Sequence, residues 1–145
     1  MKLARLLTKL IALGLASSAL ATSLPEPATL ANMAGAWMGL GQWGSHYRLL
    51  IDQSGHGQLA IRGTLEKVFL YRIDSIAFEG QSVKMRLRFT DEPQSVLKVK
   101  GDAWLGSMTL RGERVFGNDS VRFYPEAEWL ERQAAVRAAM QPGAP

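Results

Sequence analysis

Residues 83–89 have the sequence VKMRLRF, in which apolar and basic side chains alternate without exception. Successive side chains of a β-strand point to opposite faces, so this period of two predicts a half-buried strand. One face then belongs to a hydrophobic core, and the other presents cations to solvent. The apolar positions are Val83, Met85, Leu87 and Phe89, and the basic positions are Lys84, Arg86 and Arg88.

Short β-like segments, separated by turns rich in Gly, Asp, Pro and Ser, extend on both sides of this strand. Strand signals about 8–12 residues apart are typical of a sandwich or barrel, and short turns favour an up-and-down meander. We therefore expect a mainly β fold over residues 35–124, either a single antiparallel up-and-down β-barrel or a strongly curved meander sheet. The expected strands cover residues 37–41, 47–52, 58–62, 67–78, 83–89, 95–100, 103–111 and 120–124.

The sequence pattern changes from β-like to helical after residue 124. Pro125 suits the first turn of a helix, and acidic residues precede arginines along the segment, as the helix dipole favours. These signals predict a C-terminal α-helix over residues 125–141, with its regular part from Glu126 to Met140. We expect this helix to pack on the sheet, or to plug the barrel, through Trp129, Val136 and Met140.

The first 21 residues have the layout of a secretory signal peptide. A basic head is followed by the uncharged run from Leu10 to Leu20, and Ala19-Leu20-Ala21 matches an A-x-A cleavage site. We expect residues 1–21 to direct export, so that the protein is periplasmic or secreted. The Pro- and Thr-rich residues 22–34 then form a flexible lead-in to the domain.

Composition narrows the classes of partner and chemistry. The chain has 17 Lys and Arg against 13 Asp and Glu, and the predicted signal peptide holds three of the cations and no acid. The remainder is nearly neutral, so we expect no nucleic-acid partner. Cysteine is absent from the sequence, which excludes thiol chemistry, cysteine-type zinc sites and a lipid-modified cysteine at the cleavage site. We therefore do not expect a lipoprotein.

Catalytic signatures are missing from the sequence. His46 and His56 are the only two histidines, and both lie beside Gly or Ser in turn-like segments. Ser45 and His46 are neighbours, but adjacent strand residues point to opposite faces and would not meet. No G-x-S-x-G nucleophile motif is present. We therefore expect a protein that is not an enzyme and that uses no metal or cofactor.

The expected strand over residues 67–78 is apolar on both faces, so its inward face is open to two interpretations. If a tight turn keeps its even-numbered face aligned with the buried face of residues 83–89, Arg72 and Asp74 point into the barrel. Buried charges need a partner or a ligand, so Arg72 would then hold a carboxylate or phosphate. Alternatively, a β-bulge between Arg72 and Ser75 turns both charged side chains to solvent. The residues buried in their place are then Phe69, Tyr71 and Ile73.

The basic face of residues 83–89 meets further cations if the turn at residues 91–93 keeps both apolar faces together. This register places Arg86 opposite Lys98, and like charges across a β-ladder are unfavourable. One interpretation is an envelope interaction module with a filled barrel, whose basic face meets lipid headgroups, lipopolysaccharide or an acidic protein. The other is a solvated face near acids such as Glu66 or Glu113, whose cations guard the strands from aggregation. The candidate cations are Lys84, Arg86, Arg88, Lys98 and Lys100.

Gly35-Ala36-Trp37 places a G-x-W motif at the first expected strand, and this resembles the opening of lipocalins and their calycin relatives. Residues 35–47 are also similar to the opening of avidin-type barrels. The lipocalin resemblance implies that Trp37 closes one end of the barrel beneath Arg122, and that the interior takes a small apolar or amphipathic ligand. The alternative is that the aromatic side chains form a plain core. The candidate ligand-binding residues are Trp37, Tyr47, Arg72, Asp74, Trp104 and Phe123.

Overall fold

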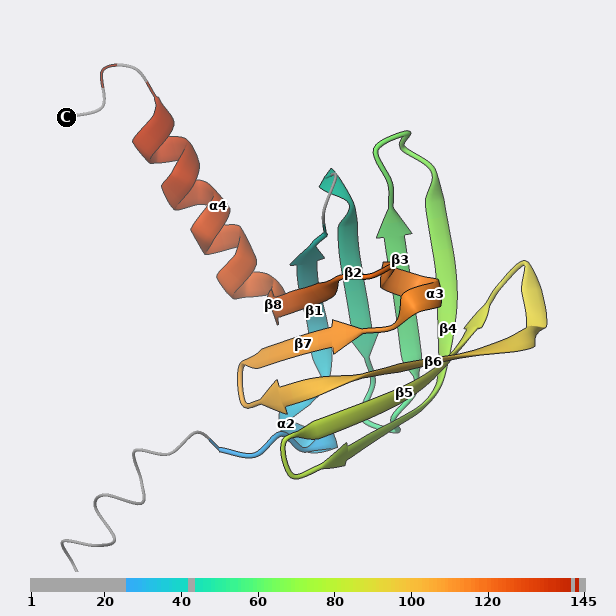
Figure 1. Cartoon of the computed structure of the whole chain (residues 1–145). Coiled ribbons are helices and arrows are strands. Elements are labelled where there is room, and N and C mark those ends of the chain that lie inside the picture. Colours follow the sequence, from blue (N-terminus) through green and yellow to red (C-terminus); the bar gives the residue numbers. More distant parts are fainter. Residues whose placement is uncertain (1–25, 42–43, 142, 144–145) are drawn as a thin grey trace, which may run out of the picture.

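The computed structural model describes residues 26–41, 44–141 and 143, and the predicted signal peptide lies outside these residues. Within them, eight antiparallel strands form a closed up-and-down barrel in which each strand pairs with the next and β8 pairs with β1 (Figure 1). The predicted fold class, a mainly β barrel followed by a C-terminal helix, is confirmed. The strands are β1 (Gly35–Leu40), β2 (His46–Ile51), β3 (Gly57–Arg62), β4 (Val68–Glu79), β5 (Ser82–Phe89), β6 (Glu92–Trp104), β7 (Ser107–Arg111) and β8 (Ser120–Pro125). The helices are α2 (Leu30–Met33), α3 (Glu113–Phe116) and α4 (Glu126–Met140).

A two-residue turn divides the strand that we expected over residues 103–111. Trp104 pairs with Ser107, and Leu105 and Gly106 form the turn between β6 and β7. Gly106 has a φ of +80°, which glycine adopts without the steric cost of a side chain. The preceding strand continues to Trp104 instead of ending at residue 100.

Alternate side chains of the strands fill the interior of the barrel. The apolar face of residues 83–89 points inward as predicted, with Val83, Met85 and Leu87 buried and Phe89 half-buried. Burial of apolar surface at about 25 cal/mol per Å² makes this interior the main source of stability. The largest fully buried side chains include Phe123, Met33, Leu49, Leu59, Ile73, Leu87, Met108 and Leu110.

Two short helices add side chains to this core. Phe116 of α3 stands edge-on to Tyr47 and Phe123, with ring centres 5.2 and 6.1 Å away. The main-chain carbonyl of Met33, at the end of α2, accepts a 2.9 Å hydrogen bond from the indole N–H of Trp37. These contacts fix both helices against the ends of the strands.

The contact between Trp37 and Arg122 that the lipocalin resemblance implies is not formed. Phe123 points into the barrel, so its neighbour Arg122 points out, and its guanidinium lies 5.2 Å from the ring centre of Tyr124. The expectation of an Arg122 cover over Trp37 was therefore wrong. The eight-stranded antiparallel barrel is consistent with a calycin-like fold.

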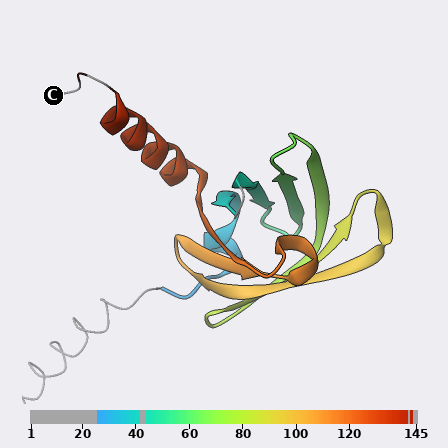
Figure 2. The same ribbon diagram turned by 45° about the horizontal axis from the view of Figure 1, so that its top comes forward.

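The C-terminal helix α4 leads away from the barrel (Figures 1 and 2). Its first turns touch the barrel through Trp129, whose ring centre lies 6.2 Å from that of Tyr124. The expected packing through Val136 and Met140 was wrong, since these side chains are 57% and 76% exposed. Polar residues interrupt the apolar positions, so α4 lacks a continuous stripe to bury. Among the described residues, no helix has the length and apolar character needed to cross a bilayer.

Candidate functional site

The charged residues in the middle of β4 lie outside the barrel, so the first of the two interpretations, in which Arg72 and Asp74 point inward, is wrong and the β-bulge alternative is confirmed. The register of β4 against β5 shifts between Ile73 and Ser75. This β-bulge leaves the Arg72 side chain 67% exposed and the Asp74 side chain 23% exposed. The residues that face inward instead are Phe69, Tyr71 and Ile73, as the alternative interpretation predicts.

Asp74 joins two arginines on the outer surface. Its carboxylate accepts a 3.1 Å hydrogen bond from Nε of Arg72 and a second hydrogen bond from Nε of Arg88. The hydrogen bond from Arg88 holds the pKa of Asp74 below its usual value, against an opposing effect of partial burial and with further help from Arg72. Arg88 also donates to the carbonyl of Pro93 at 2.9 Å. The charge of Arg88 is therefore already matched within the protein.

The other four cations predicted for the basic face stand side by side on β5 and β6. Arg86 lies directly opposite Lys98, as predicted, and Lys84 lies opposite Lys100. The next strand adds Arg111, which lies opposite Lys100 on β7. Lys84, Lys100 and Arg111 therefore form one row across three strands, and Arg86 with Lys98 forms a second row beside it.

Arg111 was not among the residues that the sequence suggested, because the turn between β6 and β7 was not recognised. The turn at Leu105-Gly106 pairs Trp104 with Ser107, and four steps further along the ladder it brings Lys100 opposite Arg111. A two-residue loop that ends in glycine is a hairpin signal. Recognising Leu105-Gly106 as a hairpin turn would have set the register of the two strands and placed Arg111 opposite Lys100.

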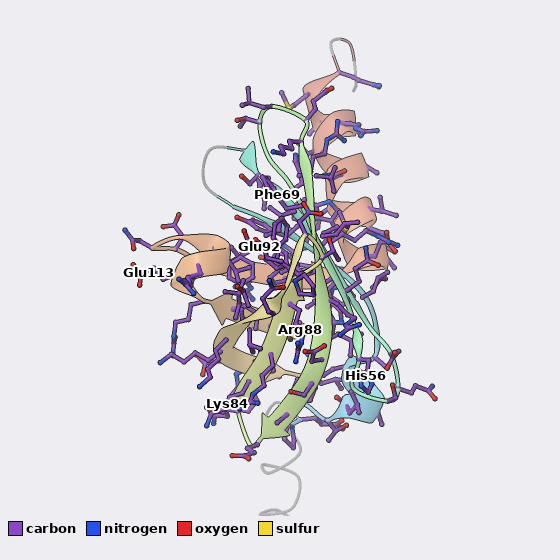
Figure 3. All side chains as sticks on the ribbon, turned by 90° about the vertical axis from the view of Figure 1, so that its right-hand side faces the viewer. His56, Phe69, Lys84, Arg88, Glu92 and Glu113 are labelled. Carbon is purple, nitrogen blue, oxygen red and sulfur yellow. The ribbon has the colours of Figure 1, made fainter. Side chains whose placement is uncertain are left out.

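The two rows form the floor of a groove of about 800 Å³ on the outside of the barrel, which we call the basic groove. It is lined by these five cations, by the acids Glu113 and Asp119, and by the neutral polar residues Ser75, Asn118 and Ser120. Glu113 on α3 and Lys84 on β5 lie on the same side of the molecule in Figure 3. The groove thus extends from β4 across β5, β6 and β7 to α3 and the start of β8.

Within the described part of the chain, none of the five cations has a carboxylate within 4.0 Å. The two acids that the sequence suggested as partners of these cations do not neutralise them. Glu66 pairs with Arg62 at 3.6 Å, and Glu113 lines the groove but forms no ion pair in the described residues. Directly opposed residues of a β-ladder have Cβ atoms about 4.5–5.5 Å apart, so the like charges repel one another. The basic groove therefore favours an incoming anion.

The aromatic residues predicted to bind a ligand lie inside the barrel or at its edge. Trp37, Tyr47 and Phe123 are buried, and Trp104 is half-buried beside Pro27. Burial is the main reason that the pKa of Tyr47 is raised. None of these four aromatic residues lines the basic groove or the smaller hollow at the barrel mouth. Their role in ligand binding remains a prediction.

A smaller hollow of about 210 Å³, which we call the mouth hollow, lies between side chains of β4, β5 and β6 and the start of α3. The rings of Tyr71 and Phe89 form part of its wall, with their centres 5.2 Å apart. Burial is the main reason that the pKa of Tyr71 is raised. Leu97 adds an apolar surface, and Glu92 and Arg114 add charges of opposite sign.

The two histidines remain in or beside turns. The hydroxyl of Ser54 donates a hydrogen bond to the carboxylate of Asp52 and lies 2.9 Å from Nδ1 of His56, from which it can only accept because its one hydrogen is already used. Asp52 in addition accepts from the main-chain N–H groups of Ser54 and His56, so the arrangement closes the turn between β2 and β3. These hydrogen bonds, that of the Ser54 hydroxyl first, hold the pKa of Asp52 below its usual value. No group of three metal-ligating side chains occurs in the residues described.

Comparisons with known proteins found no match: no protein-family model, curated protein or solved structure is similar to the chain. The chemistry of the protein must therefore be inferred from its own residues. The basic groove offers charge-assisted hydrogen bonds to an anion, and the mouth hollow offers apolar contact to a small group.

Proposed function

We propose that this protein is an exported, non-enzymatic β-barrel protein that binds an anionic partner through the basic groove. The observation that carries the proposal is the pair of cation rows, in which five like charges share one groove with no ion-pair partner in the described residues. Charge-assisted hydrogen bonds from Lys and Arg to phosphate or carboxylate oxygens would relieve this repulsion.

The closed barrel weakens the competing explanation that these cations guard strands against aggregation. Lys and Arg protect the exposed edges of sheets, where unpaired main-chain groups invite another chain. Here β5 pairs with β4 and β6, and β6 pairs with β5 and β7. β5 is paired on both sides along its length, and Lys100 of β6 is paired with both β5 and β7, whereas the part of β6 that carries Lys98 has no partner on the β7 side among the described residues. Protection of a sheet edge therefore does not account for Lys84, Arg86 and Lys100, and a binding role explains these charges better.

The predicted signal peptide suggests where such a partner would be found. An exported protein meets lipid headgroups, lipopolysaccharide and acidic envelope proteins, all of which carry phosphate or carboxylate groups. The sequence without the signal peptide is nearly neutral, so its attraction to anions is confined to one groove instead of spread over the molecule.

Titration with inorganic phosphate, followed by amide NMR shifts at low ionic strength, tests the proposal. We expect shifts confined to the groove strands, weakening as salt rises from about 50 to about 200 mM. Lys100→Gln, at the centre of the first row, should remove most of the response, whereas Arg137→Gln on exposed α4 should not. Shifts scattered over the surface, or equal in both variants, would refute the proposal.

A second candidate function is the binding of a small apolar or amphipathic ligand, and the mouth hollow favours it. The hollow of about 210 Å³ has room for one ring or a short chain against the apolar surfaces of Tyr71, Phe89 and Leu97. The neutral fluorophore N-phenyl-1-naphthylamine provides a probe. Its fluorescence should rise with the protein and fall on Phe89→Ala but not on Phe78→Ala, which lies further along β4. An equal loss in both variants would count against this site.

A further inference from the structure

We infer that the ligand of the basic groove is a compact, hydroxylated molecule carrying two phosphate-like groups about 7 Å apart. This inference rests on the proposed function and specifies its ligand. It follows from three features of the groove: the separation of the two cation rows, the acids that surround them, and the neutral polar side chains beside them.

The two rows are separated by two residues along the strands. Residues two apart on a strand lie about 7 Å apart, and neighbouring strands lie about 4.8 Å apart. Lys84, Lys100 and Arg111 thus present positive charge along a line of about 10 Å, and Arg86 with Lys98 presents a shorter line beside it. The rows are therefore matched to two anionic groups, one on each row.

A single phosphate would satisfy this arrangement poorly. Drawing all five side chains onto one anion would bring their own like charges to about 4–5 Å, where the repulsion between each pair in water is about 1 kcal/mol. Two anions let three cations meet one group and two cations meet the other. Each cation then gains an opposite charge without approaching the other row.

Acidic residues limit the length of the ligand along the strands and across them. Glu79 and Asp102 lie in the next row of the ladder, on either side of Ser82. At the bulge beyond the second row, Arg72 and Arg88 already balance the charge of Asp74, whereas Glu113 lines the side of the groove at α3 without an ion pair in the described residues. A long polyanion leaving the groove past the first row or past α3 would meet the carboxylates of Glu79, Asp102 and Glu113. A compact ligand stays within the positive region.

Neutral polar side chains complete the wall. Ser75, Asn118 and Ser120 line the groove and can donate hydrogen bonds to, or accept them from, hydroxyl groups. At about 800 Å³, the groove is within the usual range for small-molecule sites. A sugar that carries two phosphates combines these properties, either free or as the headgroup of a lipid.

Calorimetry with matched probes tests the inference. Glucose 1,6-bisphosphate should bind at least about tenfold more tightly than inorganic phosphate at equal ionic strength, because the second phosphate binds at a high effective concentration. Long-chain polyphosphate should bind no more tightly per protein than the bisphosphate. Vesicles bearing a lipid whose single-sugar headgroup carries two phosphates separate the two sources, since tighter binding to them than to the free sugar identifies a lipid headgroup and equal binding a free ligand.

Variants in one row provide the controls. Arg86→Gln with Lys98→Gln should abolish the advantage of the bisphosphate while inorganic phosphate still binds to the first row. A matched double variant at exposed positions outside the groove, Arg122→Gln with Arg137→Gln, should retain the advantage. Equal affinity for phosphate and bisphosphate would overturn the inference and leave the proposed function standing. Failure of both probes to bind would overturn both, and tighter binding of polyphosphate would show an extended ligand instead.

Discussion

Arg86 and Lys98 lie directly opposite each other on β5 and β6, and neither has a carboxylate within 4.0 Å in the described residues. This pair opposes folding, because like charges across a β-ladder repel. Natural proteins retain such local conflicts mainly where function needs them. The pair therefore links the stability of the barrel to its proposed ligand.

Replacing one member of this pair should stabilise the protein. We expect Lys98→Gln to raise the free energy of unfolding by about 0.2–1 kcal/mol in dilute buffer, and by less in about 1 M salt, where the repulsion is screened. Denaturant titration of both proteins at both salt concentrations measures the change. Arg137→Gln on α4 serves as the control and should change stability little. A loss of stability, or a gain that salt leaves unchanged, would show that the two cations do not repel.

The cluster around Asp74 should make stability depend on acid. Its pKa lies below the usual 3.8, chiefly because Arg88 hydrogen-bonds to the carboxylate. A depressed pKa stabilises the folded state above pH 3.8, and this contribution is lost as the pH falls through the folded value. Asp74→Asn should therefore be less stable than the parent near neutral pH, and the difference should begin to shrink near pH 3.8 and disappear as the pH falls through the lower pKa of the folded state.

Urea denaturation midpoints of the parent and of Asp74→Asn, measured from about pH 7 to about pH 2.5, test this expectation. Glu131→Gln, on the exposed side of α4, provides the comparison for the loss of one carboxylate. A difference in midpoint that is the same at every pH would mean that the Asn variant acts through packing and not through charge.

The sequence predicted the strands whose two faces differ and failed where both faces are alike. The alternation of residues 83–89 determined the fold class, the inward residues and the opposition of Arg86 and Lys98. Residues 67–78 are apolar on both faces, so periodicity alone allowed two registers. The bulge at Ile73 and Ser75 selects between them through pairing with β5 and through the contact of Asp74 with Arg88, which the pattern of β4 alone does not contain.

The candidate site was predicted only in part, because only some of its residues lie on strands whose two faces differ. Four of its five cations belong to strands with clear alternation, whereas Arg111 depended on recognising the turn at Leu105-Gly106. Arg88 was expected on the same face, but the bulge places Asp74 beside it and satisfies its charge. The groove itself arises from the curvature of the closed barrel and the position of α3. Neither the curvature of the barrel nor the position of α3 can be predicted from the pattern of residue types.

The aromatic contacts of α3 should be important for stability. Phe116 is buried against Tyr47 and Phe123, so Phe116→Ala removes a large side chain from the core. We expect a loss of about 3–5 kcal/mol in the free energy of unfolding, measured by chemical denaturation. The control is Leu130→Ala on α4, an exposed position whose change should stay within about 0.5 kcal/mol. Similar losses in both variants would contradict the arrangement of the core.

The exposed part of α4 should be dispensable for folding of the barrel. Removal of residues 130–145 keeps the contact of Trp129 with Tyr124 and the 3.2 Å ion pair of Arg48 with Glu126. It removes the guanidinium of Arg132 from above the Tyr124 ring, an exposed contact worth about 0.5–1 kcal/mol. We expect a loss of no more than about 1 kcal/mol by denaturation. A much larger loss would mean that the helix packs against the barrel in solution.

The close approach of β6 and β7 should connect the fold to the groove. A Cβ atom on Gly101 would overlap the main-chain carbonyl of Thr109, and backbone atoms cannot move aside as a flexible side chain can. Gly101→Ala should therefore cost about 1–3 kcal/mol and displace β7 from β6. Because Lys100 precedes Gly101 and pairs with Arg111 across the same ladder, the first cation row should lose its alignment. Phosphate affinity should then fall in protein that is still folded, whereas Gly63→Ala, where a Cβ meets open space, should leave both properties unchanged.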